Sequence, residues 1–281
     1  MRTLDVSVIK AEVKARLAEL GCTIDPEAET AVCRAMEAET SEIALDVLST
    51  LRENYSIARK KHIPLCQDTG TVVMFAEIGE EVAFTGGSLI DTLQEAVREV
   101  WKEQYYRASI VADPVFHRVN TKNNTPAVIH TEFVKGDKLT LQLALKGGGA
   151  ENMSALKMLK PSDGAEGIKS FVLETVIQAG GNPCPPIIVG IGVGGNFETC
   201  ALMAKKALFR KLGEPHPDKQ WADLEKELLQ AINKTGIGAQ GLGGKTTALA
   251  VHIETAPCHI ASLPVAVNLQ CHAHRHTTIV I

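Results

Sequence analysis

The stretch Pro186-Ile-Ile-Val-Gly-Ile-Gly192 is a short apolar run bounded by proline and glycine, a pattern typical of a strand buried on both faces. Helical patterns follow it at 197–212 and 219–234. Apolar strand patterns then occur near 248–253 and 263–267. Strands that alternate with helices predict a mixed α/β (α+β) fold.

Upstream of this stretch, the first 60 or so residues are predicted to be helical. Apolar residues recur at helical spacing over 4–20, and Asp25-Pro26-Glu27 has the capping Asp and first-turn Pro of a second helix, which is expected to reach about residue 60 with one break. The remaining elements are predicted as strands at 71–78, 127–133 and 138–145, the last two joined through 135–137, and as helices at 88–106 and 165–178.

Size and charge limit the classes of function. The chain has 281 residues, 45% of them hydrophobic, and is expected to form one catalytic domain over 1–281. A net charge of −4 and the lack of any long basic run argue against nucleic acid or an anionic membrane as partner. Met1 leads into an amphipathic segment with no apolar signal core, and no apolar run could span a bilayer, so we expect a cytoplasmic protein.

Three of the seven cysteines lie in loops rich in proline, glycine or polar residues: Cys66, Cys184 and Cys271. Such loops suit thiolate ligands, because free main-chain N–H groups stabilise the sulfur charge. A four-iron cluster held by three cysteines would leave one iron open to substrate as a Lewis acid. Spacing alone leaves zinc binding and plain burial as alternatives.

Four motifs in order resemble those of class I fumarases and related iron–sulfur hydro-lyases. They are Cys66-Gln-Asp-Thr-Gly70, Lys146-Gly-Gly-Gly-Ala-Glu-Asn-Met-Ser154, Cys184-Pro-Pro186 and the block 263–271. The resemblance covers the chain from about residue 57 onward. It implies that Cys66, Cys184 and Cys271 bind a [4Fe–4S] cluster, and that the reaction is the reversible hydration of fumarate to (S)-malate, a step of the tricarboxylic acid cycle.

The resemblance also implies roles for polar residues. Arg107 matches an arginine that binds a substrate carboxylate, a group that a planar guanidinium suits. Gln67 and Asp68 follow the first ligand and can hydrogen-bond substrate or bound water; Gln67 is a candidate for substrate binding and Asp68 for catalysis. Gly149 lies in a glycine stretch that lets main chain approach the ligand. His259, twelve residues before the third ligand, is a candidate for proton transfer.

Several alternatives remain. The segment 238–246 ends in Gly-Lys-Thr, but Ala239 stands where a nucleotide-binding phosphate loop needs glycine, so Lys245 is predicted to support an anionic site. The His and Cys residues over 258–276 could form a zinc module. Within the family, L-tartrate dehydratase and mesaconate-type hydratase α subunits compete with fumarate hydratase, although Gly149-Ala-Glu-Asn152 is more similar to fumarases.

The family comparison further predicts a partner. Single-chain members continue into a smaller C-terminal domain that supplies a proposed base and further carboxylate contacts, whereas this sequence ends ten residues after Cys271. We therefore expect a separate β subunit, an α2β2 assembly and a small dicarboxylate substrate.

Overall fold

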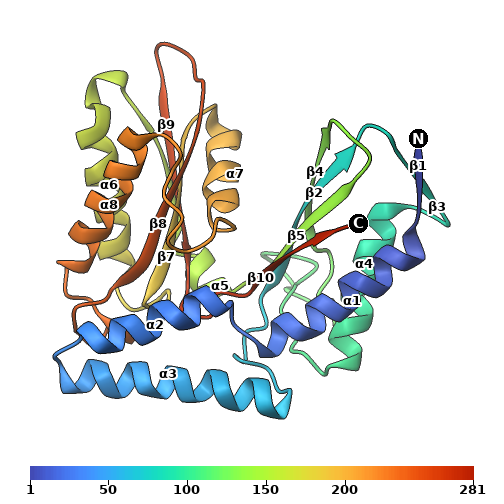
Figure 1. The fold of residues 1–281 in the computed structure, drawn as a ribbon, viewed down its shortest axis with the longest axis horizontal. Coiled ribbons are helices and arrows are strands. Elements are labelled where there is room, and N and C mark those ends of the chain that lie inside the picture. Colours follow the sequence, from blue (N-terminus) through green and yellow to red (C-terminus); the bar gives the residue numbers. More distant parts are fainter. The chain divides into compact units, whose positions relative to one another are not determined.

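A computed structural model describes the whole chain, Met1–Ile281, as two compact units. The first unit contains Met1–Asp25, Tyr55–Gly148 and Arg275–Ile281, and the second contains Pro26–Asn54 and Gly149–His274. Each unit is built on one four-stranded sheet (Figure 1). The fold is mixed α/β, as the sequence predicts.

The sheet of the first unit has the strand order β10-β5-β2-β4. Strand β2 pairs in parallel with β4 and antiparallel with β5, and β10 pairs antiparallel with β5. The bounds of these strands are β2 (Thr71–Gly79), β4 (Val128–Val134), β5 (Leu139–Lys146) and β10 (His276–Val280). A short parallel pair, β1 (Arg2–Asp5) and β3 (Val82–Thr85), completes the strands of this unit.

Two helices cover the first sheet, α1 (Val6–Cys22) and α4 (Leu89–Glu103). Each begins at a capping side chain: Asp5 accepts from the Ser7 amide at 2.8 Å, and Ser88 accepts from the Asp91 amide. Their apolar faces join the inward side chains of the sheet in one core, which includes Ile9, Val13 and Leu93. The apolar residues that recur at helical spacing in the sequence therefore face the sheet.

The sheet of the second unit has the order β6-β9-β7-β8. Strand β7 is parallel to β8 and antiparallel to β9, which is antiparallel to β6. The strands are β6 (Ala155–Leu159), β7 (Ile187–Gly194), β8 (Ala248–Ala256) and β9 (Leu263–Gln270). The accompanying helices are α2 (Pro26–Ala38), α3 (Glu42–Lys61, which extends into the first unit), α5 (Gly148–Glu151, at the boundary), α6 (Gly164–Ala179), α7 (Phe197–Ala207) and α8 (Lys219–Asn233).

Helices lie on both faces of the second sheet (Figure 1). Helices α6 and α8 share a core with one face of the sheet, while α7 packs on the other through Cys200 and Ala204. The glycines of β7 make this approach possible. A Cβ at Gly192 would lie 2.0 Å from the Cys200 carbonyl oxygen, and one at Gly190 would lie 2.2 Å from that of Ala204. Helix α7 therefore packs directly against the main chain of β7 at Gly190 and Gly192.

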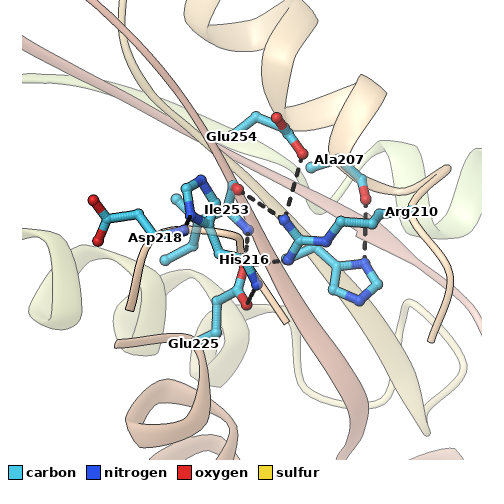
Figure 2. Close-up of polar contacts among 8 residues, drawn as sticks. Ala207, Arg210, His216, Asp218, Glu225, Ile253 and Glu254 are labelled. Carbon is cyan, nitrogen blue, oxygen red and sulfur yellow. Dashed lines mark hydrogen bonds and ion pairs between the residues drawn. The ribbon is translucent and has the colours of Figure 1, made fainter. Parts of the chain in front are cut away.

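A polar network fastens the segment after α7 to β8 in the second unit (Figure 2). The Arg210 guanidinium forms an ion pair with the buried Glu225 and donates to the Ile253 carbonyl at 3.1 Å. Glu225 also accepts from the main-chain N–H groups of His216, at 3.0 Å, and Ile253, at 2.7 Å. Glu225 is thus bound by the Arg210 side chain and by two main-chain N–H groups, so we assign this network a role in stabilising the fold.

The structure can be compared with the elements predicted from the sequence. The strands predicted at 127–133 and 138–145 form as β4 and β5, but they do not pair, because β2 lies between them. The long helical pattern after Asp25 breaks once, between α2 and α3, as expected. Strands β1, β3, β6 and β10 were not predicted. No helix combines the length and apolar character needed to cross a membrane.

Candidate functional site

Two of the predicted cysteine ligands lie at one edge of the second sheet. Strands β7 and β9 are antiparallel, with Ile188 opposite Gln270. Cys184 comes shortly before β7 and Cys271 directly after β9, so the register brings both loops to the same edge. The His272 amide donates to the Cys184 carbonyl at 3.2 Å, which ties the two loops together.

The Cys184 loop has a defined and unusual conformation. Cys184 has φ of +57°, a left-handed conformation that non-glycine residues rarely adopt. Its amide donates to the Gly181 carbonyl at 3.0 Å, and the Pro185 carbonyl accepts from both the main chain and the side chain of Gln240. The thiol is exposed although its main chain is anchored. A fixed main chain with an accessible sulfur suits a metal ligand.

The end of the glycine motif lies beside these two loops. A Cβ at Gly149 would stand 3.2 Å from the carbonyl oxygen of Asn182, two residues before Cys184. The Ser154 hydroxyl accepts from the Leu269 amide at 3.2 Å, and Glu151 accepts from the Asn268 side chain at 3.2 Å. Three of the sequence motifs thus meet at one edge of the second sheet.

The Cys66 motif forms a loop before β2 in the first unit. Cys66 and Gln67 are exposed, while Asp68 is half-buried. The Asp68 carboxylate accepts from the Gly70 amide at 2.9 Å and from the Gly148 amide at 2.8 Å. Because β2 and β5 are antiparallel, the start of one strand and the end of the other meet here, and Asp68 joins them.

Side chains from other segments fix the main chain of this loop. Arg275 donates from Nη2 to the Asp68 carbonyl at 3.1 Å. The buried Asn124 donates from Nδ2 to the Gly70 carbonyl at 3.0 Å. The Thr69 hydroxyl donates to the Arg107 carbonyl at 3.0 Å, which places Arg107 next to the loop. Arg107 itself has an exposed side chain, as a carboxylate-binding group requires.

Two candidates lie elsewhere. His259 is in the turn between β8 and β9, at the end of the second sheet opposite Cys184 and Cys271. Strand β9 separates it from Cys271 by about 23 Å at the usual rise per residue. Lys245 follows the loop of Gln240, and its ammonium group donates to the Ala38 carbonyl at 3.1 Å while its amide donates to Glu39 at 2.7 Å. The structure thus gives Lys245 local partners.

The remaining cysteines differ from the three predicted ligands. Cys22 and Cys200 are buried, and burial raises the pKa of each thiol above its ordinary value. A raised pKa disfavours the thiolate that a metal needs. Cys33 lies half-buried in α2, and Cys258 is exposed beside His259.

No group of three or more His, Cys, Asp or Glu side chains is gathered in a metal-binding arrangement. Cys66 belongs to the first unit, and Cys184 and Cys271 belong to the second. The donor set nevertheless fits an iron–sulfur cluster. All three cysteine residues are at least partly exposed, their loops are anchored by main-chain hydrogen bonds, and thiolate is the ligand that such clusters require.

Sequence reasoning missed the residues that hold the Cys66 loop: Thr69, Asn124 and Arg275. Asn124 lies in a polar segment that offered no periodic signal, and Arg275 lies among histidines that draw attention to metal binding. The only signal was indirect, since buried polar side chains must find partners.

Comparison with known proteins agrees with the motifs. The family described as fumarate hydratase (Fumerase) matches residues 10–280. A protein of Methanocaldococcus jannaschii, provisionally named as the alpha subunit of an L(+)-tartrate dehydratase, is 46% identical over 263 residues, covering 92% of each chain. The L(+)-tartrate dehydratase subunit alpha of Escherichia coli K12 is 35% identical over 249 residues, covering 87% of this chain and 81% of its own.

The fold and these matches define the class of protein as an enzyme, a hydro-lyase. The chain belongs to the fumarate hydratase (Fumerase) family of iron–sulfur hydro-lyases, which includes the tartrate dehydratase alpha subunits. Membership implies a metal cluster. The relatives are named as alpha subunits, which implies a beta subunit.

Proposed function

We propose that this chain is the cluster-bearing α subunit of a two-subunit hydro-lyase that converts fumarate and (S)-malate reversibly. The observation that carries the proposal is the tie between the Cys184 and Cys271 loops, made by the hydrogen bond from the His272 amide to the Cys184 carbonyl. The exposed Cys184 and the half-buried Cys271, 87 residues apart in sequence, share one sheet edge with the glycine motif. Packing alone does not require this combination.

We propose that Cys66, Cys184 and Cys271 bind a [4Fe–4S] cluster. When bound, the cluster supplies an iron without a cysteine ligand, which acts as a Lewis acid toward the hydroxyl and carboxylate oxygens of the substrate. Support comes from the accessibility of these cysteines, of which Cys66 and Cys184 are exposed and Cys271 is half-buried. The buried Cys22 and Cys200 thiols are poorer ligands, because burial raises the pKa of each.

The polar residues of the first unit have complementary proposed roles. Arg107 binds one substrate carboxylate through its exposed guanidinium, and Gln67 donates to substrate oxygens. Asp68 accepts or returns a proton at its carboxylate, whose orientation is set by the Gly70 and Gly148 amides. Gly149 is proposed to let the main chain approach the substrate. A larger residue there would also press on the Asn182 carbonyl.

The positions of His259 and Lys245 limit the roles that can be proposed for them. His259 lies at the far end of the sheet from Cys271, so its position does not support a part in proton transfer next to this ligand. Lys245 already bonds to the end of α2, and its proposed support of an anionic site acts through its charge.

We propose that a β subunit completes the enzyme in an α2β2 assembly. The relatives' designation as alpha subunits supports the partner. The partner would supply a second carboxylate contact, because one anchored end leaves the reacting carbons of a dicarboxylate unpositioned.

Dehydration of L(+)-tartrate is the second candidate, and the names of the relatives favour it. Loss of water from tartrate gives the enol of oxaloacetate, so the two reactions share the removal of a hydroxyl and a neighbouring proton. They differ in one substituent hydroxyl. A pocket that hydrogen-bonds this group rejects the substrate that lacks it by a large factor, so one of the two substrates should dominate.

Anaerobic co-expression with the companion β subunit, followed by assays on fumarate, (S)-malate, L(+)-tartrate and mesaconate, tests the proposal. We expect iron and sulfide in the protein and the highest kcat/KM with fumarate or malate. A preference for tartrate or mesaconate would correct the substrate and leave the class of reaction intact. A colourless enzyme with stoichiometric zinc would refute the cluster assignment.

A further inference from the structure

The most unusual buried group in the first unit is the guanidinium of Arg275. Its residue is 1% exposed, and it is among the largest fully buried side chains of the chain. Its Nη2 donates to the Asp68 carbonyl at 3.1 Å, whereas Nε and Nη1 are buried and have no hydrogen-bond partner. No carboxylate forms an ion pair with it. Arg275 is therefore a buried positive charge without a direct ion pair.

Such a charge is costly for a fold, because the guanidinium loses its water and gains too few hydrogen bonds in return. Arg210 illustrates the ordinary solution. It is also largely buried, but it pairs with Glu225 and Glu254. A buried arginine that lacks such an ion-pair partner is therefore a candidate for interaction with a negatively charged group.

The position of Arg275 indicates where such a group would lie. Its side chain holds the carbonyl of Asp68, two residues after Cys66, and its own carbonyl accepts from the Leu145 amide at the end of β5. The Gly148 amide, three residues beyond Leu145, in turn bonds the Asp68 carboxylate. Arg275 thus braces both chain segments that frame the Cys66 loop.

We propose that Arg275 is a positioning residue for the iron–sulfur cluster, fixing the Cys66–Asp68 loop and compensating the negative charge that the thiolate-bound cluster brings. This inference rests on the proposed function, since it assumes that Cys66 is a ligand. A fixed charge in a poorly screened interior acts over several ångströms, so Arg275 need not touch the cluster. Its role is electrostatic and conformational.

The proposal predicts opposite effects on the empty and the loaded protein. Replacing Arg275 with Met removes a buried charge that has no direct ion pair, so the cluster-free variant should unfold at the same temperature as the wild type or a higher one. The same change should release iron to a chelator at least ten-fold faster. It should also shift the reduction potential of the cluster to more negative values, because adding an electron becomes harder once a nearby positive charge is lost.

The test uses the full chain, reconstituted with ferrous iron and sulfide under anaerobic conditions. Arg275→Met is compared with the wild type, with Arg275→Lys, and with Arg98→Met, which removes an exposed arginine from α4 of the same unit. We expect Arg98→Met to match the wild type in iron release and potential. Arg275→Lys, which keeps the charge, should keep the wild-type potential.

The outcomes separate this inference from the proposed function. If the wild type takes up no cluster, the proposed function fails, and the inference fails with it. If the wild type loads and Arg275→Met shows unchanged iron release and potential, only the inference fails. A cluster-free Arg275→Met protein less stable than cluster-free wild type would make Arg275 an ordinary residue of the fold and overturn the proposal.

Discussion

The carboxylate of Asp68 accepts a hydrogen bond from the Gly148 amide at 2.8 Å, across 80 residues of sequence. This bond links the Cys66 motif to the glycine motif within the first unit. It gives Asp68 a fixed orientation while its side chain stays half-exposed. A group that is both oriented and accessible suits proton transfer.

The first prediction concerns Asp68. Asp68→Asn keeps an oxygen for the Gly148 or Gly70 amide and removes the carboxylate, so the fold and the iron content should persist. If Asp68 transfers the proton, kcat should fall by about 10²–10⁴-fold. Steady-state rates at matched cluster content provide the measurement, and a rate within two-fold of the wild type would exclude this role.

The second prediction concerns the cluster ligands. Cys66→Ala, Cys184→Ala and Cys271→Ala should each abolish cluster loading, because a three-cysteine site has no spare thiolate. Cys33→Ala and Cys200→Ala are the controls, since the first lies half-buried in α2 and the second is buried between α7 and the sheet. The measurement is the iron and sulfide content of each variant, together with its visible spectrum. A full cluster content in any one of the three ligand variants would show that its cysteine is not a ligand.

The third prediction concerns Arg107. Arg107→Lys keeps a positive charge but loses the two-pronged contact with a carboxylate, so turnover of fumarate or malate should fall by one to three orders of magnitude. Cluster content should stay normal, because only the carbonyl of Arg107 contributes to the Cys66 loop. Unchanged kcat/KM would return Arg107 to the role of a solvent-exposed residue.

The fourth prediction concerns the ion pair in Figure 2. Glu225→Gln leaves the partly buried Arg210 guanidinium without its main partner, and the free energy of unfolding should fall by about 3 kcal/mol. Lys219→Ala is the matched control, because it breaks the exposed pair with Asp223 and should cause no measurable change. Urea titrations of both variants test this, and equal stabilities would show that the buried pair is not needed.

The fifth prediction concerns the glycines of β7. Gly192→Ala adds a methyl group whose carbon would lie 2.0 Å from the Cys200 carbonyl oxygen. We therefore expect α7 to move away from the sheet. Overpacking of this kind costs about 1–3 kcal/mol. Thermal unfolding measures the loss. A crystal structure of the variant with α7 unmoved would contradict the explanation.

The local elements and the motifs could be predicted from the sequence alone. Ser88 caps α4 as its position predicts, and the apolar run after Pro186 forms the buried strand β7. These features depend on residues within a few positions of one another, so local propensity and periodicity are sufficient to find them. The cysteine motifs are likewise contiguous in sequence, and they identified the family.

Which distant segments lie together became clear only from the three-dimensional fold. Strand β2 separates β4 from β5, although these two follow each other in sequence. Arg275 reaches the carbonyl of Asp68 from 207 residues away, and Asn124 reaches that of Gly70 from 54. Sheet order and buried side-chain hydrogen bonds arise when distant segments pack together and satisfy their polar groups, and no local pattern in the sequence encodes that pairing.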